Sequence, residues 1–363
     1  MVYNFINLPI TIFFIANGFG QLYYALKLRK KFPEDHNLLN SFIVFILWIL
    51  AGILYPLFYI RDNYNIRWFQ SLSVQIICIY APLLVFFILF YQYQIILKKD
   101  PMLKMRRTIE NFKSEFELVN NQNKNSKKAH FSTDLHRKSF HLIPAIVIIL
   151  LWFFAVEVWD NLWNADLFWG ITGEEYAIFL ILTVGYTGII IFAALDYVRL
   201  SYIFENRTIY HLMPKNVSNL LIKTLKPIEI YEFTKPVALI VSLVPIFFFL
   251  PFGIFAAVAL IASIGDGAAS IFGIRFGRIH FPKNSEKTVI GYIAGFLCSL
   301  GIGYIILGVF ESSLYPLELL LVSFSGAIVF LIIDLLSPKI DDNILNPIFC
   351  ALAIFLVYSF LTN

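Results

Sequence analysis

Charged residues are scarce in this sequence. Asp, Glu, Lys and Arg make up 14% of its 363 residues, whereas soluble domains carry roughly 25%. A chain with so little surface charge is not a soluble globular protein. It also lacks the alternation of apolar and polar residues that a membrane β-barrel requires. Apolar runs of about 20 residues recur instead, and each is long enough to cross a bilayer. The sequence therefore predicts an all-α, multi-span integral membrane helical bundle.

Cysteine is also scarce, and its placement argues against two kinds of site. The three cysteines, Cys78, Cys298 and Cys350, each lie inside an apolar run. They have neither the spacing of metal ligands nor the pattern of a disulfide framework, so we interpret them as small apolar residues. The net charge is a modest +4. Nothing in the sequence predicts a nucleic-acid partner or an oligomeric state.

The apolar runs predict about ten transmembrane helices. They lie near residues 5–26, 39–60, 69–97, 140–156, 175–196, 236–250, 252–271, 289–310, 314–336 and 344–361. The run 236–271 is too long for one comfortable span. The segment "LPFG" at 250–253 offers a Pro-Gly turn, so we divide the run there and expect a short sixth span.

The basic residues set the predicted orientation of the spans. In residues 1–31 the basic segment "KLRKK" follows the apolar run, the reverse of the order in a cleaved leader. With the N-terminus outside, the outside loops contain only Arg61 and Arg67 as basic residues. The inside loops, which carry the other membrane-flanking Lys and Arg residues, are 27–38, 98–139, 197–235, 272–288 and 337–343. The sequence therefore predicts an N-terminus outside.

Residues 98–133 interrupt the membrane pattern. Apolar residues recur there at helical spacing among charged ones, namely Met102, Met105, Ile109, Phe112, Phe116 and Val119. This pattern predicts an amphipathic helix lying on the inner membrane surface. We therefore divide the chain into three N-terminal transmembrane helices (1–97), a cytosolic amphipathic linker (98–133) and a seven-span catalytic module (134–363).

Ionisable residues gather in four clusters at the predicted inner ends of the spans. The clusters are "DLHRKSFH" (134–141), "LDYVRL" (195–200), "GDGAASIFGIRFGRIHFPKNSEKTVIG" (265–291) and "DLLSPKIDDNILNP" (334–347). Ionisable groups beside a bilayer are costly and commonly functional. Because all four clusters fall on one face, we expect a single polar site at the depth of the inner headgroups.

The residue types in these clusters fit phosphate chemistry with a metal ion. Carboxylates and amides suit Mg²⁺, and Arg and Lys neutralise phosphate oxygens. Glycines allow the backbone to approach a ligand closely. Two simpler interpretations remain open. Basic residues at inner helix ends are commonly topology anchors, and the spacing of Gly273 and Gly277 also fits helix–helix packing.

These motifs resemble those of the CTP-dependent polyprenol, dolichol and phytol kinases, with the related CTP-dependent diacylglycerol kinase and the phosphatidate cytidylyltransferases. "DLHRKSFHLIPA" is similar to the family's "RRKxxH" opening, and "GDGAASIFGIRFGRIHFP" is similar to its "GDxxAxxxGxxxGxH" core. "SEKTVIG" resembles "KKTxEG", and "LSPKIDDNILNPIFCAL" resembles the closing "DNxxxPxxxA". The match covers roughly residues 134 to 361, so the first three spans lie outside it.

The resemblance implies a CTP- and Mg²⁺-dependent kinase that phosphorylates the hydroxyl of a membrane lipid alcohol. Asp266 and Asp342 are the implied metal ligands and catalytic carboxylates, Asn343 completes their site, and His141 is an implied proton acceptor. The implied nucleotide-binding residues are Arg137, Lys138, Arg275, Arg278, Lys283, Lys287, Thr288, Gly265, Gly273 and Gly277. CTP, the phosphoryl donor, would enter from the cytosol and the alcohol from the bilayer. The site would then face the cytosol at the plasma membrane or endoplasmic reticulum.

Some residues depart from the family pattern, and two other functions remain alternatives. Ile290 stands where the family usually has Glu, and Asp334 stands where we expect Glu. The C-terminal lysine–aspartate and "HGG…DR" signature of true phosphatidate cytidylyltransferases is missing, which favours a kinase over an enzyme that makes a CDP-lipid. The second alternative is a transporter, but transporters place polar groups near the bilayer midplane. The sequence does not specify which lipid alcohol is used.

Overall fold

The computed structural model describes residues 5–59, 64–125, 127–282, 285 and 287–362. These residues are helical or irregular, with no β-strand among them, and a single isolated bridge joins His280 to Thr288. Nine of their helical segments are long and apolar enough to cross a membrane: Phe5–Lys31, Leu38–Phe58, Tyr64–Lys99, Thr133–Leu162, Gly173–Ile203, Phe252–Phe276, Val289–Phe310, Pro316–Leu336 and Asp342–Thr362. The predicted all-α, multi-span membrane bundle is therefore confirmed.

The predicted sixth span is a shorter helix. It is α12 (Lys235–Phe249), with 15 residues, which is fewer than the roughly 20 that span a bilayer upright. About ten membrane-length helices were predicted, and nine are present within the described residues. The orientation of the N-terminus stays a prediction.

The chain divides by packing into two compact units. The first unit comprises Met1–Asn121 and Leu150–Val237, and the second comprises Gln122–Ile149 and Ala238–Asn363. Helix α8 (Lys127–Phe153) begins in the second unit and ends in the first. The ranges 1–97, 98–133 and 134–363 divide the chain by expected role, and they stay a prediction.

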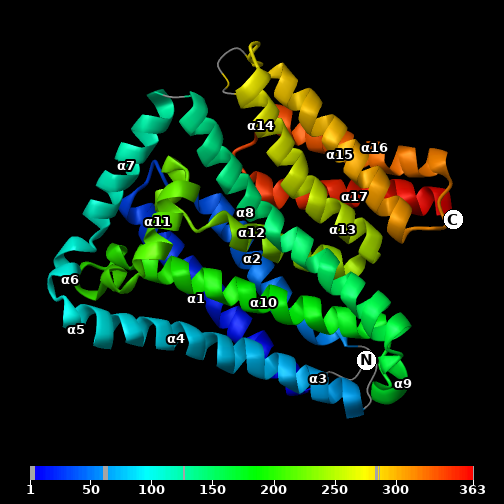
Figure 1. Ribbon diagram of the computed structural model, residues 1–363, viewed down its shortest axis with the longest axis horizontal. Helices are drawn as coiled ribbons and strands as arrows, with labels where there is room; N and C mark the ends of the chain where they lie inside the picture. The colour runs from blue at the N-terminus through cyan, green and yellow to red at the C-terminus, as the bar shows by residue number, and fades with distance from the viewer. Residues whose placement is uncertain (1–4, 60–63, 126, 283–284, 286, 363) are drawn as a thin grey trace. The chain divides into compact units, whose positions relative to one another are not determined.

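The first unit is built on helices α1 (Leu8–Lys31), α2 (Leu38–Leu54), α3 (Tyr64–Gln75), α4 (Ala81–Tyr91), α5 (Leu97–Lys99) and α10 (Gly173–Arg199). Two π-helical turns join α3, α4 and α5 into one long rod, coloured cyan and blue in Figure 1. Buried hydroxyls tie neighbouring helices together, because the bilayer offers no water to pair them. Thr11 Oγ1 donates to the carbonyl O of Gly52 at 2.8 Å, and Tyr186 Oη donates to that of Ala51 at 2.8 Å.

The predicted amphipathic segment is helical, as α6 (Met102–Arg106) and α7 (Ile109–Asn125). Phe112 and Phe116 are each 3% exposed. They pack in one cluster with residues from the end of α10 and from α11 (Lys215–Thr224). The expectation that this apolar face covers the membrane surface is therefore wrong for the two phenylalanines, which the protein itself buries. Met102 and Met105 remain exposed.

His36 links the start of α2 to a distant segment of the first unit. Its ring is buried, with Nδ1 2.9 Å from the carbonyl O of Tyr231 and Nε2 3.2 Å from Ser41 Oγ. Burial lowers the pKa of His36 below its ordinary value of 6.5, the charge of Arg29 lowers it further, and the bond to Tyr231 opposes both. The folded protein therefore keeps this histidine neutral at a pH where the unfolded chain binds a proton.

We expect the first unit to lose stability as the pH falls from about 7.5 to about 5.5, because the unfolded state then binds a proton that the folded state does not. The contribution is complete above the ordinary histidine pKa of about 6.5 and declines below it. His36→Gln should flatten this dependence. Thermal unfolding in a non-ionic detergent at the two pH values measures it. The exposed His136 supplies the control His136→Gln, and equal pH slopes in the two variants would contradict the assignment.

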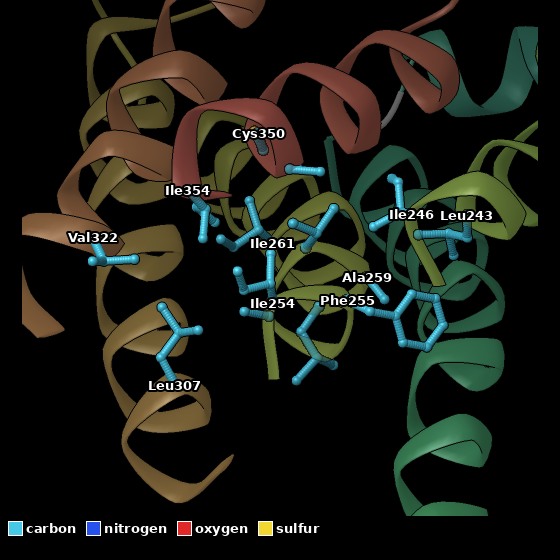
Figure 2. Packing of buried hydrophobic residues seen from close by; sticks show 14 of the residues in the cluster. Leu243, Ile246, Ile254, Phe255, Ala259, Ile261, Leu307, Val322, Cys350 and Ile354 are labelled. Carbon is cyan, nitrogen blue, oxygen red and sulfur yellow. The ribbon is translucent and has the colours of Figure 1, made fainter. Parts of the chain in front are cut away.

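The second unit surrounds a central apolar helix. Helix α13 (Phe252–Leu260) continues through a π-helical turn into α14 (Asp266–Phe276). Every residue of α13 from Gly253 to Leu260 is buried, which is typical of a core helix that is apolar on all sides. It packs within one core cluster on α15 (Val289–Phe310), α16 (Pro316–Leu336) and α17 (Asp342–Thr362). Figure 2 shows this packing around Ile254, Phe255 and Ile261.

Helices α14 and α15 approach closely at Gly291. A Cβ atom at this position would lie 2.7 Å from the carbonyl O of Ala269 and 3.4 Å from the Cα atom of Gly273. Both neighbours are backbone atoms, which cannot move aside as a flexible side chain can. Gly291 is therefore required for the contact between α14, which begins with Asp266, and the helix that follows it.

Gly291→Ala is expected to lower the free energy of unfolding by about 1–3 kcal/mol, the usual cost of overpacking. Gly301→Ala is the matched control on the same helix, because its Cβ atom would meet nothing within 4 Å. Alanine is the better helix former by about 1 kcal/mol, so the control should be neutral or stabilising. Denaturation in detergent, followed by circular dichroism, compares the two. Equal stabilities would show that the close approach is not required.

Candidate functional site

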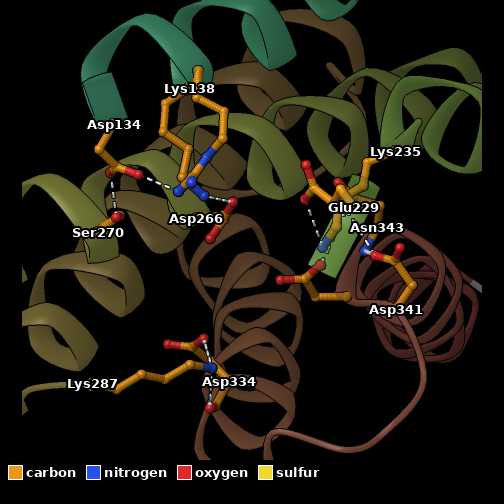
Figure 3. Close-up of polar contacts among 12 residues, drawn as sticks. Asp134, Lys138, Glu229, Lys235, Asp266, Ser270, Lys287, Asp334, Asp341 and Asn343 are labelled. Carbon is orange, nitrogen blue, oxygen red and sulfur yellow. Dashed lines mark hydrogen bonds and ion pairs between the residues drawn. The ribbon is translucent and has the colours of Figure 1, made fainter. Parts of the chain in front are cut away.

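Two polar contacts join α8 to α14 within the second unit. Lys138 forms an ion pair with Asp266, the first residue of α14, and Asp134 accepts a hydrogen bond from Ser270. Asp134 and Lys138 are four residues apart on α8, and Asp266 and Ser270 are four residues apart on α14. The two contacts therefore lie one helical turn apart, along the sides on which the helices face each other. Arg137 also pairs with Asp134 from the same helix. Figure 3 shows Asp134, Lys138, Asp266 and Ser270 pointing toward one another.

Burial strengthens these contacts. Asp134 is 5% exposed and Lys138 9% exposed, whereas the Asp266 side chain is 29% exposed. The lysine is thus held inside the protein by its carboxylate partner, which is itself half-buried. A half-buried carboxylate beside a buried ammonium group is an arrangement in which the lysine compensates the charge of the carboxylate.

A second lysine–aspartate pair lies between α15 and α16. Lys287, just before α15, places its Nζ 2.7 Å from Asp334 Oδ1 and 2.8 Å from the carbonyl O of Asp334, in the last turn of α16. The negative charges of Asp266 and Asp342 both act on the Asp334 carboxylate. Asp266 at the start of α14 and Asp342 at the start of α17 therefore lie near enough to Asp334 for their charges to act on it. Lysines compensate Asp266 and Asp334.

The start of α17 carries a local network of its own. Asn343 donates from Nδ2 to Asp341 Oδ1 at 2.8 Å and to Asp342 Oδ1 at 3.1 Å, and its backbone N–H donates to Asp341 Oδ1 at 2.9 Å. Ser242 Oγ donates to the carbonyl O of Asn343 at 3.1 Å. The sequence assigned Asp342 and Asn343 to a metal or hydroxyl-positioning site. In the structure the Asn343 amide is already occupied in fixing the two aspartates.

Four of the predicted nucleotide-binding residues have packing or capping roles. Thr288 caps α15 by accepting the N–H of Gly291 at Oγ1, at 3.2 Å. Gly273 and Gly277 both lie against Thr288, and a Cβ atom at Gly265 would meet the side chains of Ser299 and Phe330. Helix packing, the simpler of the two sequence interpretations, accounts for these glycines. Their contact with a nucleotide stays a prediction.

The remaining predicted residues are placed less directly. Arg275 and Arg278 are exposed after the carboxylate-bearing turn of α14, and the Arg275 guanidinium lies 6.0 Å from the ring centroid of Phe131. Lys283 lies outside the described residues, as does the side chain of His141. The structure thus brings together Arg137, Lys138, Asp266, Lys287 and Asp342, with Asn343 beside the last of them.

The sequence analysis placed Asp134, Ser270 and Asp334 within the charge clusters but gave none of them an individual role. A signal for the first two was present in the spacing, because Asp134 and Lys138 are four residues apart, as are Asp266 and Ser270. Asp334 was noted as the first residue of the fourth charge cluster and as a departure from the family pattern. Nothing in its local sequence shows that it faces Lys287.

The second charge cluster proves to be a separate structural feature of the first unit. Asp196 and Arg199, on α10, are 0% and 1% exposed. The Arg199 guanidinium binds Asp196 and the carbonyl oxygens of Glu229, Ile230 and Glu232. The hydrogen bonds of the pair are made to protein atoms. The pair therefore fixes the loop that contains these carbonyl groups and does not bind a ligand.

The donor set can be compared with what Mg²⁺ requires. Within the described part of the chain, no three His, Cys, Asp or Glu side chains are close enough to hold a metal ion among themselves. Mg²⁺ commonly uses one or two carboxylates and completes its shell with water and substrate phosphates. Asp266 and Asp342 supply carboxylates of that kind, and Lys138 now neutralises the first. Asp266 and Asp342 are therefore the residues that would hold such an ion.

No protein-family model matches the sequence, and no curated protein or solved structure matches it either.

Proposed function

We propose that this integral membrane protein is a CTP- and Mg²⁺-dependent kinase that phosphorylates a lipid alcohol, such as a polyprenol, dolichol or shorter isoprenoid alcohol. One observation carries the proposal most. The charges of Asp266 and Asp342, each at the start of a helix, act on Asp334 near the end of α16. Lys138 pairs with Asp266, and Lys287 pairs with Asp334. Alternating carboxylates and ammonium groups match a substrate that carries both Mg²⁺ and phosphate.

In the proposed mechanism the two lysine–aspartate pairs exchange partners when the nucleotide binds. Lys138 and Lys287 turn from their aspartates to phosphate oxygens, and Arg137 adds a further donor. The aspartates are then released toward the cation and the alcohol. Each charge is compensated before and after the exchange, so the substrate does not have to bind beside a bare buried charge.

The chemical step requires positioning more than covalent chemistry from the protein. The alcohol oxygen bonds to the γ-phosphorus, the bond from that phosphorus to the β-phosphate oxygen breaks, and CDP leaves. The hydroxyl proton passes to a protein base, for which Asp266 and His141 are the candidates. When bound, Mg²⁺ held by Asp266 and Asp342 supplies charge neutralisation on the phosphates.

The position of these residues in the chain fits a substrate that lies in the bilayer. Asp266 begins α14 after the π-helical turn that follows the apolar α13, Asp334 lies in the last turn of α16, and Asp342 begins α17. A hydroxyl at headgroup depth can reach such helix ends while its tail stays in lipid. The basic flanking loops favour the cytosolic face, at the plasma membrane or the endoplasmic reticulum, and an N-terminus on the opposite side.

The test uses purified protein in non-ionic detergent with Mg²⁺, a panel of lipid alcohols, and phosphatidate. CTP labelled at the γ-phosphate is compared with CTP labelled at the α-phosphate. Transfer of the γ-label to an alcohol, with release of CDP, supports the proposal and identifies the alcohol. Transfer of the α-label to phosphatidate, with release of pyrophosphate, would establish a cytidylyltransferase instead. If neither label enters lipid across the panel, the kinase proposal fails.

A further inference from the structure

The chain turns back sharply at one end of the long rod in the first unit. The segment Tyr64–Lys99 is long and apolar enough to cross a membrane, and α6 follows it after Asp100 and Pro101. Asp100 forms the turn, because its Oδ1 accepts the N–H of Met102 at 3.2 Å. Figure 1 shows α6 next to α5, where the rod ends. The turn and both helices belong to the first unit.

Arg107 holds α6 against the rod. Its Nη1 donates to Gln92 Oε1 at 2.8 Å and to the carbonyl O of Met213 at 3.4 Å. Gln92 begins the last π-helical turn of the rod, Gln92–Ile96. The contact with Gln92 therefore fixes the end of α6 at the depth of that turn, so this short helix has a defined place in the fold.

The apolar outer surface of the rod ends at the same depth. Four large side chains in its last turns are between 40% and 54% exposed, namely Phe90, Tyr91, Tyr93 and Ile95. Apolar side chains on the outside of a membrane-length helix contact lipid, and tyrosines gather at the membrane–water interface. Lys98 and Lys99 follow them and are exposed. The membrane boundary therefore falls in the last turns of the rod, where α6 lies.

Helix α6 presents apolar side chains at this boundary. Met105 is 71% exposed and Met102 is 54% exposed. Because they are three residues apart, they lie on one face of the helix. Unlike Phe112 and Phe116 on α7, which the protein buries, the two methionines are available to lipid. Their flexible, unbranched side chains adapt to an irregular surface.

The residues around the methionines carry a surplus of positive charge. The sequence 98–107, "KKDPMLKMRR", contains five basic residues and one acidic residue. Four of the basic residues are exposed, namely Lys98, Lys99, Lys104 and Arg106. Asp100 and the next acidic residue, Glu110, can compensate at most two of the five charges. The turn Tyr210–Leu212 packs on α6 and adds His211, whose pKa is lowered by burial and then by the charge of Lys104.

We propose that α6 and the end of α5 bind the headgroup of an anionic phospholipid, with Met102 and Met105 inserted between the lipids. Clusters of Lys and Arg beside a membrane-spanning helix attract anionic lipids. The exposed methionines favour a lipid over a soluble anion, which would leave them in water. A simple topology anchor would need the charges but neither a preferred headgroup nor an inserted side chain. The proposal concerns the first unit alone and does not depend on the proposed kinase activity.

Lipid binding to the purified full-length protein in a non-ionic detergent tests the proposal. Fluorescence anisotropy follows phosphatidylglycerol that carries a fluorophore on one acyl chain, and phosphatidylcholine with the same fluorophore is the neutral comparison. Phosphatidylglycerol is expected to bind at least about fivefold more tightly. Unlabelled phosphatidylglycerol should displace it, whereas glycerophosphoglycerol, the headgroup without its chains, should not.

Matched double variants connect binding to α5 and α6. Lys98→Gln with Lys99→Gln removes two exposed positive charges and should weaken phosphatidylglycerol binding by about tenfold or more. Phosphatidylcholine binding should not change. The control is Lys27→Gln with Lys30→Gln, which removes two exposed charges near the end of α1, a helix without methionine. The control should weaken binding by less than about twofold, because its charges lie outside the proposed site.

Insertion of the methionine face is measured in nanodiscs. Met105→Cys is labelled with a membrane-impermeant maleimide, and the unsubstituted protein gives the background from its three native cysteines. Labelling should be at least about fivefold slower in discs of equal parts phosphatidylglycerol and phosphatidylcholine than in discs of phosphatidylcholine alone. Ser114→Cys, at an exposed position on α7, should be labelled equally in both.

Several results would overturn the proposal. The two lipids would bind equally, the two double variants would behave alike, or the free headgroup would compete as well as the lipid. Equal labelling of Met105→Cys in the two kinds of disc would also contradict it, because the methionine face would then not enter an anionic bilayer.

Discussion

Replacing Arg199 by methionine is expected to lower the free energy of unfolding by about 3–5 kcal/mol, the cost of leaving a buried charge without its partner. The guanidinium lies 3.0 Å from Asp196 Oδ1 and 3.0 Å from the carbonyl oxygens of Glu229 and Ile230. Methionine fills a similar volume but donates no hydrogen bond. The variant would leave the Asp196 carboxylate without a positively charged partner and several carbonyl groups without a donor in the interior.

A second substitution, at Asp196, separates the cost of the unpaired charge from the rest of the stability loss. Asp196 Oδ2 also accepts the backbone N–H of Thr234 at 2.8 Å and its hydroxyl at 2.9 Å. Adding Asp196→Asn to the Arg199 variant removes the uncompensated charge while keeping an acceptor for Thr234. The double variant should therefore recover part of the lost stability.

An exposed ion pair of the same unit supplies the control. Lys31 and Glu205 lie 3.9 Å apart, and the Glu205 side chain is 86% exposed. Glu205→Gln should change the free energy of unfolding by no more than about 1 kcal/mol. Denaturant titration in detergent, followed by circular dichroism, compares the variants. A loss below about 1 kcal/mol for Arg199→Met would mean that water reaches the pair after the substitution.

The Asp196–Arg199 pair shows which properties of a charged residue follow from local sequence and which depend on the fold. Ionisable residues at a membrane boundary are rare enough that "LDYVRL" was read as part of the polar site. Besides Asp196, the partners of Arg199 are carbonyl groups thirty or more residues away. A backbone carbonyl has no signature in the sequence. Local composition therefore identified an unusual residue correctly, but not whether it holds a ligand or a loop.

The helices themselves were predictable because apolar length is a local property. An apolar helix face is also a local property, and this explains why α7 was wrongly expected to place that face on the membrane. The spacing of Phe112 and Phe116 predicted one apolar helix face correctly, but an apolar face packs equally well on lipid or on protein. Only the fold supplies Val198 and Tyr210 as its covering. For the same reason, the spacing of Gly273 and Gly277 left ligand approach and helix packing as equal alternatives.

Within the candidate site, the residue types were predictable and the pairings were not. Lys138 and Asp266 are separated by 128 residues, and the sequence expected both in one site without expecting an ion pair. Asp334 was expected in the polar site as part of the fourth cluster, but its contact with Lys287 was not predicted. Long-range pairing depends on how helices pack, and a single sequence carries little information about that.

Asp266→Asn is expected to reduce CTP-dependent phosphorylation of a lipid alcohol by about 10³-fold or more, as loss of a central charged group does in phosphoryl transfer. Asparagine keeps the shape of the side chain but can neither accept a proton nor neutralise a metal ion. The Asp266 side chain is 29% exposed, so its folded structure should persist. Steady-state kinetics with γ-labelled CTP measure the effect. Glu318→Gln, at the opposite end of α16, is the control and should keep full activity.

Lys138→Met tests whether Lys138 binds the phosphates of CTP or only compensates the charge of Asp266. If Lys138 only neutralises Asp266, its loss should lower stability and leave the KM for CTP unchanged. If it turns to the phosphates as proposed, the KM for CTP should rise about tenfold, since one charge-assisted hydrogen bond contributes roughly 1.5–3 kcal/mol. Because Lys138 is 9% exposed, unfolding must be measured alongside. A stable variant with an unchanged KM would refute the exchange of partners and leave Asp266 as the only member of the pair that acts on the substrate.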